Sequence, residues 1–200
     1  FSLSLAGAAC SEAPIDRPRQ AAAPERPSAG LQTAIFAGGC FWSTEADFEQ
    51  VPGVVDAVSG YTGGRTRDPT YAEVTSGATG HYEAVRVTYD PSRVTYRQLV
   101  DLFWRTIDPT DAGGQFCDRG DSYRPAVFVQ GEAQRREALA SREVAARRVQ
   151  PFRAPVLTAS TFWPAEAYHQ DYYKKNALRY RVYRTGCGRD ARLRAVWGGR

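Results

Sequence analysis

Cys40 is placed where a reactive thiol would be expected, because an apolar stretch ends there in two glycines and a segment with helical spacing begins. Residues 38–42 read Gly-Gly-Cys-Phe-Trp. At the start of a helix, unpaired backbone N–H groups and the positive end of the helix dipole lower the pKa of a thiol below about 8.5. The glycines leave room for a ligand. We favour a reactive thiolate, and the alternative is a buried structural cysteine.

Other side chains suit chemistry at a nucleophilic sulfur. Phe41 and Trp42 would form an apolar wall for a substrate with a small apolar group on a polar reacting atom. Glu83 begins an apolar strand pattern, where burial would raise the pKa of its carboxyl and let it donate a proton to a substrate oxygen. A surface position for Glu83 fits the pattern equally well. Tyr71 and Tyr123 border glycine-rich loops, where tyrosines often only pack.

The cysteines and histidines give no metal signature. Four cysteines occur without a Cys-x-x-Cys pair: Cys10, Cys40, Cys117 and Cys187. With two histidines, His81 and His169, this argues against a zinc site. The wide spacing also argues against a disulfide scaffold, so we interpret the cysteines as separate reactive thiols that meet in the fold. A hydrolase-like pair of Cys40 with either histidine stays open.

Composition is typical of one domain with tails. The chain has 200 residues, 42% of them hydrophobic, and a net charge of +4. Because no basic block is interleaved with aromatic residues, we expect no nucleic-acid partner. Asp118 follows Cys117 in a Cys-Asp-Arg-Gly string, where a turn-forming aspartate is the ordinary interpretation.

The first thirty residues have the composition of a leader and a tether. Residues 1–9 look like the end of a secretory apolar region followed by small residues, and Cys10 comes next. Gly7 stands where a lipoprotein signal has Leu, which favours a cleaved signal over an acylated Cys10; a disordered Ala-rich tail is the alternative. The prolines of 11–30 predict a flexible tether. We therefore divide the chain into 1–30 and a folded domain, 31–200, and expect export to a periplasm-like space, with a cytoplasmic location as the alternative.

Periodicity predicts alternating strands and helices. Strand patterns cover 33–37, 54–61, 82–89, 126–130 and 156–161, and helical spacing covers 41–50, 95–106, 131–150 and 166–176. In the helix 131–150, the predicted apolar face holds Ala138, Leu139, Val144 and Ala145. Long loops at 62–79 and 108–124 are expected to carry function, and 180–200 is expected to be an irregular tail. The order β-α-β-β-α-β predicts an α+β, two-layer ferredoxin-like plait with its helices on one face of a mainly antiparallel sheet.

Short strings along residues 33–176 together resemble the type A peptide-methionine sulfoxide reductases. The most specific are Gly-Cys-Phe-Trp at 39–42, Gly-Tyr-Thr-Gly-Gly at 60–64 and Gly-His-Tyr-Glu-Ala-Val at 80–85. Pro-Thr-Tyr at 69–71, Asp-Pro-Thr at 108–110, Asp-Arg-Gly at 118–120 and His-Gln-Asp-Tyr at 169–172 also match. Three departures are Ser-Thr at 43–44, Cys117 where many members have Asn or Gly, and a tail with the single cysteine Cys187 where some branches have a pair.

The resemblance implies a role for each candidate residue. Cys40 would attack the sulfur of a methionine S-sulfoxide, free or in a protein, and Glu83 would protonate the oxygen. Tyr71 and Tyr123 would hydrogen-bond that oxygen, Phe41 and Trp42 would hold the methyl group, and Asp118 would organise the substrate side of the pocket. The products would be methionine and a Cys40 sulfenic acid. The resemblance implies repair of oxidised proteins by a monomer without cofactor or metal, with thioredoxin or a thioredoxin-like protein as the reductant.

A sulfenic acid on Cys40 needs a second thiol to resolve it. Cys187 lies between two glycines in the predicted irregular tail, whose backbone could swing. Neighbouring arginines at 184, 189 and 192 would favour its thiolate. We prefer Cys187 over Cys117 as the resolving thiol and expect Cys10 to be dispensable. A cysteine hydrolase or acyltransferase, and an exported thiol sensor, are the other functions weighed.

Overall fold

The structure of this protein is a computed structural model that describes residues 30–198. The predicted leader, the tether apart from Gly30, and Cys10 lie outside the described residues. Within the described range, none of the helices combines the length and the apolar character that a bilayer crossing requires.

A six-stranded sheet forms the centre of the fold. Its strands are β1 (Gln32–Ala37), β2 (Val54–Thr62), β3 (Tyr82–Tyr89), β6 (Ala126–Val129), β7 (Val156–Thr158) and β8 (Trp163–Pro164). They are ordered β7-β6-β1-β3-β2-β8, and every neighbouring pair is antiparallel except β6 with β7. The sheet is therefore mixed but mainly antiparallel, and the predicted α+β class is confirmed.

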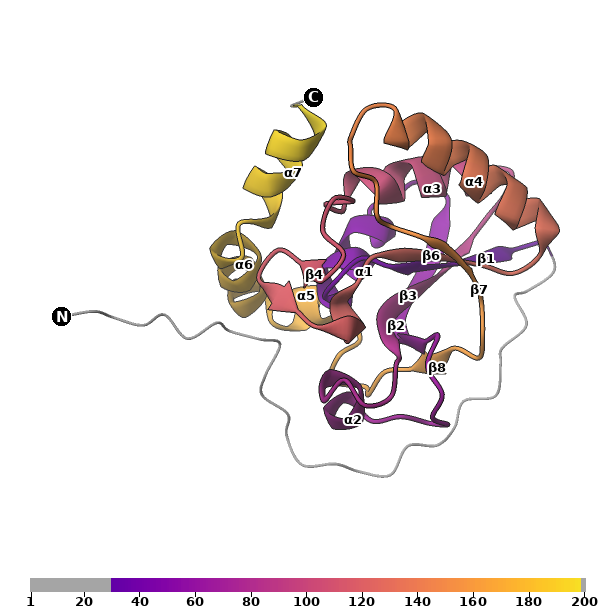
Figure 1. The fold of residues 1–200 in the computed structure, drawn as a ribbon. Helices are drawn as coiled ribbons and strands as arrows, with labels where there is room; N and C mark the ends of the chain where they lie inside the picture. The colour runs from indigo at the N-terminus through magenta and orange to yellow at the C-terminus, as the bar shows by residue number, and fades with distance from the viewer. Residues whose placement is uncertain (1–29, 199–200) are drawn as a thin grey trace.

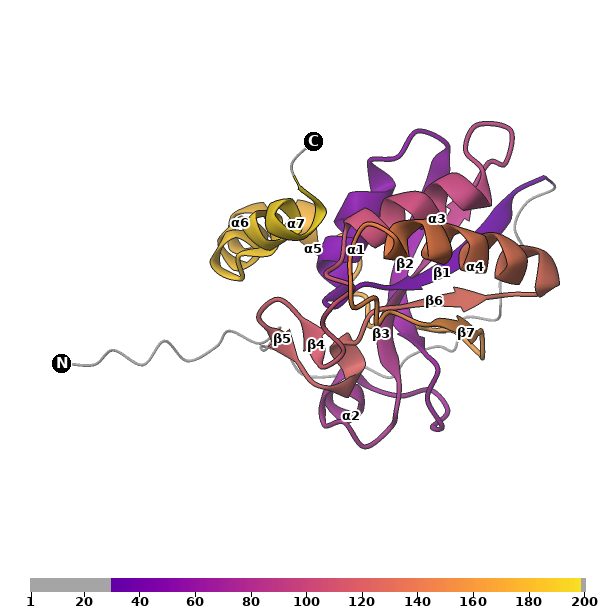
Figure 2. The same ribbon diagram turned by 45° about the horizontal axis from the view of Figure 1, so that its top comes forward.

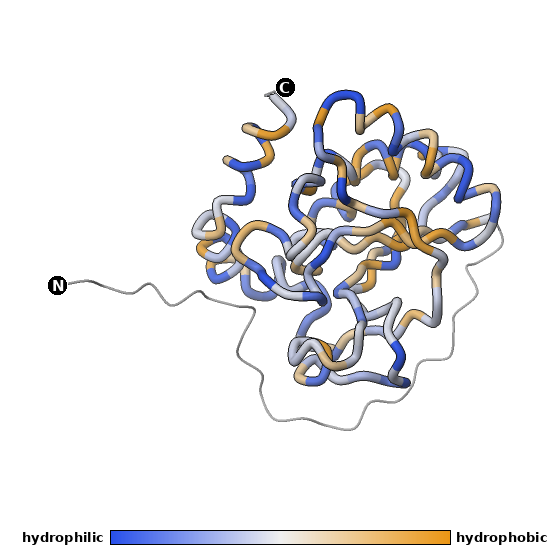
Figure 3. The backbone as a smooth tube through the Cα atoms, viewed as in Figure 1, coloured by the Kyte–Doolittle hydropathy of each residue, from blue (hydrophilic) through white to orange (hydrophobic). Residues whose placement is uncertain are grey.

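Three helices pack on one face of this sheet. They are α1 (Phe41–Glu49), α3 (Tyr96–Arg105) and α4 (Glu132–Ala146), and Figures 1 and 2 show α3 and α4 lying side by side. Alternation along the strands separates two apolar clusters, because successive side chains of a strand point to opposite faces. Phe36 packs with the helices, whereas Ile35 lies in the second cluster, against Leu157 and Phe162 from β7 and the segment after it. Figure 3 shows hydrophobic residues gathered along the central strands.

Two helices begin with a capping box, in which a threonine and a residue three positions later satisfy each other's backbone N–H groups. Thr95 with Gln98 begins α3, close to the predicted start of that helix. Thr70 with Glu73 begins the short helix α2 (Tyr71–Thr75), inside the segment predicted as a loop. The box at Thr70 fixes the backbone that carries Tyr71.

The apolar face predicted for α4 is wrong at two positions. Ala138, Ser141 and Ala145 are buried, whereas Leu139 and Val144 are about half exposed. Small residues let α4 approach α3 closely, and the Ser141 hydroxyl accepts a hydrogen bond of 2.9 Å from Trp104 Nε1. The buried stripe thus consists of two alanines and a serine, which a search for large apolar residues does not identify.

The predicted irregular tail is also wrong, because the chain after residue 171 is largely helical. It forms α5 (Tyr172–Lys175), α6 (Ala177–Gly186) and α7 (Arg189–Trp197), and the helix predicted at 166–176 is reduced to α5. Figure 1 shows α6 and α7 beside the hairpin of β4 (Gly114–Gln115) and β5 (Asp118–Arg119). Polar contacts hold these helices, including Arg184 to Asp47 at 2.8 Å and Trp197 Nε1 to the Ile107 carbonyl at 3.0 Å.

The buried carboxyl of Glu45 joins α1 to β2 and to the backbone at Asp171. Its oxygens accept hydrogen bonds from the Ser59 hydroxyl on β2 and from the Asp171 backbone N–H. Burial raises the pKa of Glu45 to about 7, partly offset by these two hydrogen bonds. The folded state therefore holds this proton more tightly than the unfolded chain. The resulting stabilisation is complete below the unfolded pKa and is lost as pH rises through 7.

We expect Glu45→Gln to flatten the pH dependence of the free energy of unfolding. One such group contributes at most about 1.4 kcal/mol per pH unit, so the change should be roughly 2–3 kcal/mol between about pH 5 and about pH 7. Urea denaturation over that range measures it. Glu132→Gln, at an exposed position of α4, is the control and should keep the wild-type slope. An unchanged slope in Glu45→Gln would contradict the assignment of this proton.

Candidate active site

Cys40 is the N-cap residue of α1 and is wholly buried. Gly39, just before it, has a φ of 83°, and a Cβ there would meet Gln115 Cβ at 2.6 Å, so glycine is required. The Cys40 carbonyl accepts from the Ser43 N–H at 3.1 Å, which begins the helix. Cys40 takes no part in the disulfide that the other two described cysteines form. The predicted position of Cys40 at the start of a helix is confirmed.

Glu83 lies against the same helix terminus. Its Oε2 accepts a 3.0 Å hydrogen bond from the Phe41 backbone N–H, so the carboxyl contacts the residue that follows Cys40. The side chain is fully buried, and Oε1 has no hydrogen-bond partner among the described residues. Burial raises the pKa of Glu83 well above its ordinary value; hydrogen bonds from Phe41 and Tyr123 oppose this, and nearby Asp118 adds to it. Burial therefore favours the protonated form of this carboxyl, and the surface alternative is excluded.

Aromatic rings surround this helix terminus. The Phe41 ring lies 4.9 Å from the ring of His169, and His169 lies 4.5 Å from Tyr71. Trp42 stacks on Tyr172 with centroids 3.6 Å apart, and its Nε1 donates to His169 Nδ1 at 3.0 Å. The fold thus brings together three residues that the sequence analysis proposed separately: Phe41, Trp42 and Tyr71. His169 and Tyr172, which belong to one of the quoted strings but were given no role in the pocket, complete the cluster.

Glu166 positions two tyrosines of the same region. It accepts from the Tyr71 backbone N–H at 2.9 Å and from the Tyr61 hydroxyl at 2.8 Å. Sequence reasoning did not nominate Glu166, because it lies far along the chain in a segment predicted as helix. Its contacts depend on the tertiary structure, and no local sequence pattern indicates them.

Tyr123 and Asp118 reach the site from the hairpin region. Tyr123 is buried in the short 3₁₀ helix η1 (Asp121–Tyr123) and hydrogen-bonds the Glu83 carboxyl. Asp118 is buried in β5, and its Oδ2 accepts a hydrogen bond from the Tyr183 hydroxyl of α6. The structure therefore places both residues near Glu83.

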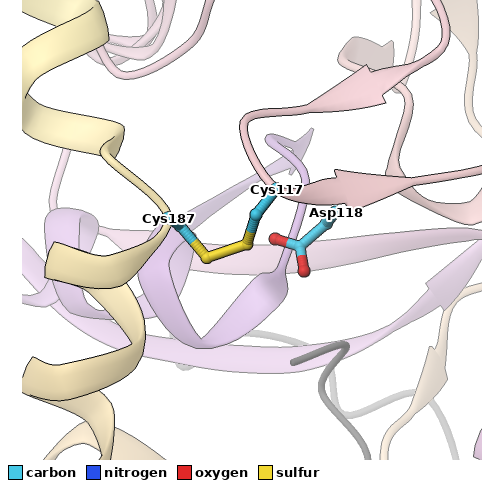
Figure 4. A group of neighbouring side chains, drawn as sticks. All are labelled: Cys117, Asp118 and Cys187. Carbon is cyan, nitrogen blue, oxygen red and sulfur yellow. A yellow bond between two sulfur atoms is a disulfide. The ribbon is translucent and has the colours of Figure 1, made fainter. Parts of the chain in front are cut away.

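Cys117 and Cys187 form a disulfide, with their Cα atoms 4.9 Å apart (Figure 4). It joins the β4–β5 hairpin to the turn between α6 and α7, across 70 residues of sequence. The sequence predicts reactive thiols that meet in the fold, and these two cysteines do meet. Cys117 is exposed, and Cys187 lines a surface hollow. The other residues of the hollow are Asp108, Thr110, Asp111, Phe116 and Arg192.

The arginines expected to activate Cys187 already have other partners. Arg184 pairs with Asp190 as well as Asp47, and Arg192 pairs with Asp108 at 2.7 Å. Arg189 is buried and donates to the carbonyls of Gly38 and Thr106 at 3.2 and 2.9 Å. Arg189 thus fastens α7 to the loop that carries Cys40. Cys187 therefore lies in a turn between two helices and not in the predicted irregular tail.

Both histidines have positions that weaken the hydrolase alternative. His81 Nδ1 accepts from the Gly64 N–H at 3.2 Å, and its Nε2 lies 2.9 Å from the Thr66 carbonyl. Trp42 Nε1 can only donate, so His169 Nδ1 must be unprotonated to accept from it. His81 therefore supports the glycine-rich loop, and His169 supports the aromatic cluster.

Comparison with known proteins decides the family. The family described as peptide methionine sulfoxide reductase matches residues 32–200. The chain belongs to the type A peptide methionine sulfoxide reductases. It is 58% identical to peptide methionine sulfoxide reductase MsrA 2 of Caulobacter vibrioides over 181 residues, which is 90% of this chain and 92% of that protein.

Solved structures agree with this membership. Mxr1 of Saccharomyces cerevisiae in reduced form is 31% identical with a TM-score of 0.72, covering 76% of this chain and 90% of that one. Mxr1 has also been solved in complex with Trx2. That Mxr1 chain is 24% identical to this one, and the match has a TM-score of 0.53 over 74% of this chain and 88% of that one. This likeness shows the fold alone.

Proposed function

We propose that this chain reduces methionine S-sulfoxide, free or in oxidised proteins, with Cys40 as nucleophile and Glu83 as acid. The observation that carries the assignment is the hydrogen bond from the Phe41 N–H to Glu83, which places a buried carboxyl at the helix terminus that begins with Cys40; burial raises the pKa of this carboxyl and so favours its protonated form. Membership of the family supports the same reaction.

The chemistry follows from these two groups. The Cys40 thiolate attacks the sulfoxide sulfur, and the S–O bond breaks as Glu83 transfers its proton to the oxygen. Because an unprotonated oxygen is a poor leaving group, the proton is required for the step. Tyr71 and Tyr123 hydrogen-bond the oxygen, and Phe41 and Trp42 enclose the methyl group. Asp118 organises the substrate side of the pocket. The released hydroxide, or a water, then attacks the Cys40 sulfur of the resulting sulfonium intermediate. The bond between the two sulfurs breaks with its electron pair on methionine, and the products are methionine and Cys40 sulfenic acid.

A second thiol then returns Cys40 to its reduced form. We assign this to Cys187, which attacks the sulfenic sulfur and releases water to give a Cys40–Cys187 disulfide. Cys117 next attacks Cys187, forms the Cys117–Cys187 disulfide and releases Cys40 as a thiolate. A disulfide between Cys117 and Cys187 that leaves out Cys40 corresponds to the end of this sequence.

An external dithiol must reduce that last disulfide. The exposed Cys117 and the hollow beside Cys187 leave it open to solvent. A thioredoxin or thioredoxin-like protein supplies two thiols in one molecule and suits this task. The yeast relative solved in complex with Trx2 is in keeping with this choice.

The assignment is tested by incubating the protein with dithiothreitol and a racemic methionine sulfoxide. We expect the S epimer alone to be consumed. If neither epimer is consumed while Cys40 remains open to alkylation, the reductase assignment is wrong. Ester or amide hydrolysis would favour the hydrolase alternative, and oxidised Cys40 without methionine would favour a sensor.

We further propose that the protein acts as a monomer exported to a periplasm-like space, with residues 1–30 as leader and tether and 31–200 as the catalytic domain. The composition of residues 1–30 supports export, and fatty-acid labelling with cell fractionation in a bacterial host tests it. A purely cytosolic, unlabelled protein would contradict the proposal.

We also class β6-β1-β3-β2, with α1 and α3, as a ferredoxin-like plait, which their antiparallel order supports.

A further inference from the structure

The Asp118 carboxyl lies beside the Cys117–Cys187 disulfide. A carboxyl oxygen of Asp118 and the two sulfur atoms all lie within 4.8 Å of one another. Figure 4 shows one carboxyl oxygen directed toward the sulfur of Cys117. The three residues come from two places in the chain, because Asp118 follows Cys117 directly in the hairpin and Cys187 lies between α6 and α7.

This carboxyl is buried with one oxygen uncommitted. Asp118 is 2% exposed, and its Oδ2 accepts from the Tyr183 hydroxyl. Its Oδ1 has no hydrogen-bond partner among residues 30–198. A buried carboxyl that has an uncommitted oxygen, and that lies within 4.8 Å of two sulfurs through one of its oxygens, can accept a proton from a thiol or return it to a thiolate.

The charged and titratable groups around Asp118 come from four elements. They are Cys117 beside it, Tyr183 on α6, Arg189 on α7 and Glu83 on β3, with Cys187 titrating once the disulfide is reduced. Burial raises the pKa of Asp118 to about 6, while the Tyr183 hydrogen bond and the charge of Arg189 oppose the rise. Asp118 therefore exchanges its proton close to neutral pH, which is the range in which an acid–base group is effective.

We propose that Asp118 is the proton-transfer group for the formation and reduction of the Cys117–Cys187 disulfide. During formation, Cys117 gives its proton to the Asp118 carboxylate as its sulfur attacks Cys187 in the Cys40–Cys187 disulfide. The electron pair of the broken bond goes to Cys40. This role is additional to organising the substrate pocket, and it rests on the recycling steps proposed above.

Reduction runs through the same carboxyl. A thiolate of an external dithiol attacks the exposed Cys117 sulfur, the S–S bond breaks, and Cys187 takes the electron pair together with the Asp118 proton. The second thiol of the dithiol displaces Cys117 from the mixed disulfide. The dithiol ends as a disulfide, both cysteines end as thiols, and Asp118 regains a proton from solvent.

The test measures this half-reaction without any sulfoxide. The oxidised protein is mixed with dithiothreitol, and alkylation followed by peptide mapping gives the rate at which Cys117 and Cys187 become thiols. The ratio of the wild-type rate to the Asp118→Asn rate is followed from about pH 5 to about pH 8. The ionisation of dithiothreitol cancels in this ratio. We expect this ratio to be about ten below pH 6 and to fall toward one above it. General acids usually raise a rate by ~10²–10⁴, and we expect a smaller effect here because a thiolate is a better leaving group than most.

Two further variants make the result specific. Tyr183→Phe removes a hydrogen bond that lowers the pKa of Asp118, so that pKa should rise. The ratio of the Tyr183→Phe rate to the Asp118→Asn rate should therefore fall at a higher pH than the wild-type ratio does. Asp111→Asn, which removes a nearby carboxylate that pairs with Arg119, should reproduce the wild-type profile. A ratio that is independent of pH, whether equal to one or not, would overturn the proposal. A failure of sulfoxide reduction would not alter this readout, so the two proposals fail separately.

Discussion

Glu83→Gln should lower the rate of methionine formation by roughly 10²–10⁴, because that is the usual effect of removing a general acid. The glutamine keeps the size of the side chain and retains an oxygen that can accept from the Phe41 N–H at the start of α1. It cannot deliver a proton to the sulfoxide oxygen. Single-turnover release of methionine from pre-reduced protein measures this step without the recycling cysteines.

The controls separate the proton from the surrounding contacts. Tyr71→Phe and Tyr123→Phe should each cost less than Glu83→Gln, since either tyrosine can partly replace the other at the oxygen. Far-ultraviolet circular dichroism should show the native fold in all three variants. A Glu83→Gln protein that keeps near wild-type turnover at neutral pH would show that Glu83 is not the acid.

Cys187→Ser should abolish most turnover supported by thioredoxin while leaving a single turnover intact. Without Cys187, the sulfenic acid on Cys40 waits for an external thiol. An intramolecular thiol acts at an effective concentration of at least about the millimolar range, so we expect a loss of about tenfold or more at micromolar thioredoxin. Steady-state turnover with thioredoxin, thioredoxin reductase and NADPH measures this loss.

Cys117→Ser is the matched variant, because it removes the other half of the same disulfide. It should still form the Cys40–Cys187 disulfide, which peptide mapping after one turnover with sulfoxide would identify. If Cys187→Ser kept full thioredoxin-dependent turnover while Cys117→Ser lost it, the roles of the two cysteines would be reversed.

The positions of Cys40 after one strand and of Glu83 at the start of another could be predicted from the sequence, whereas the strand pairing that brings them together is seen only in the structure. Phe36 of β1 pairs with Val85 of β3 in an antiparallel register. The end of β1, which leads to Cys40, therefore lies beside the start of β3, which carries Glu83. Strand periodicity and the two glycines before Cys40 are local signals, and together they indicate both positions.

The C-terminal part of the site had no such signal. Leu178 and Val182 of α6 are 74% and 65% exposed. The side chains of α6 that pack against the core are Tyr180 and Tyr183, so a search for aliphatic residues does not identify its buried face. Hydrogen bonds and ion pairs from Arg184 and Arg189 to distant residues also hold the helices. The Cys117–Cys187 disulfide depends on that packing.

The most direct measurement of the central claim is a single turnover by the Cys117→Ser/Cys187→Ser double variant with a peptide containing racemic methionine sulfoxide. The reaction should release one methionine per protein, from the S epimer alone. Mass spectrometry should then find the mass of one added oxygen on Cys40, trapped as a sulfenic acid that neither missing thiol can resolve. Methionine release without oxidation of Cys40, or no release from fully reduced protein, would contradict the account.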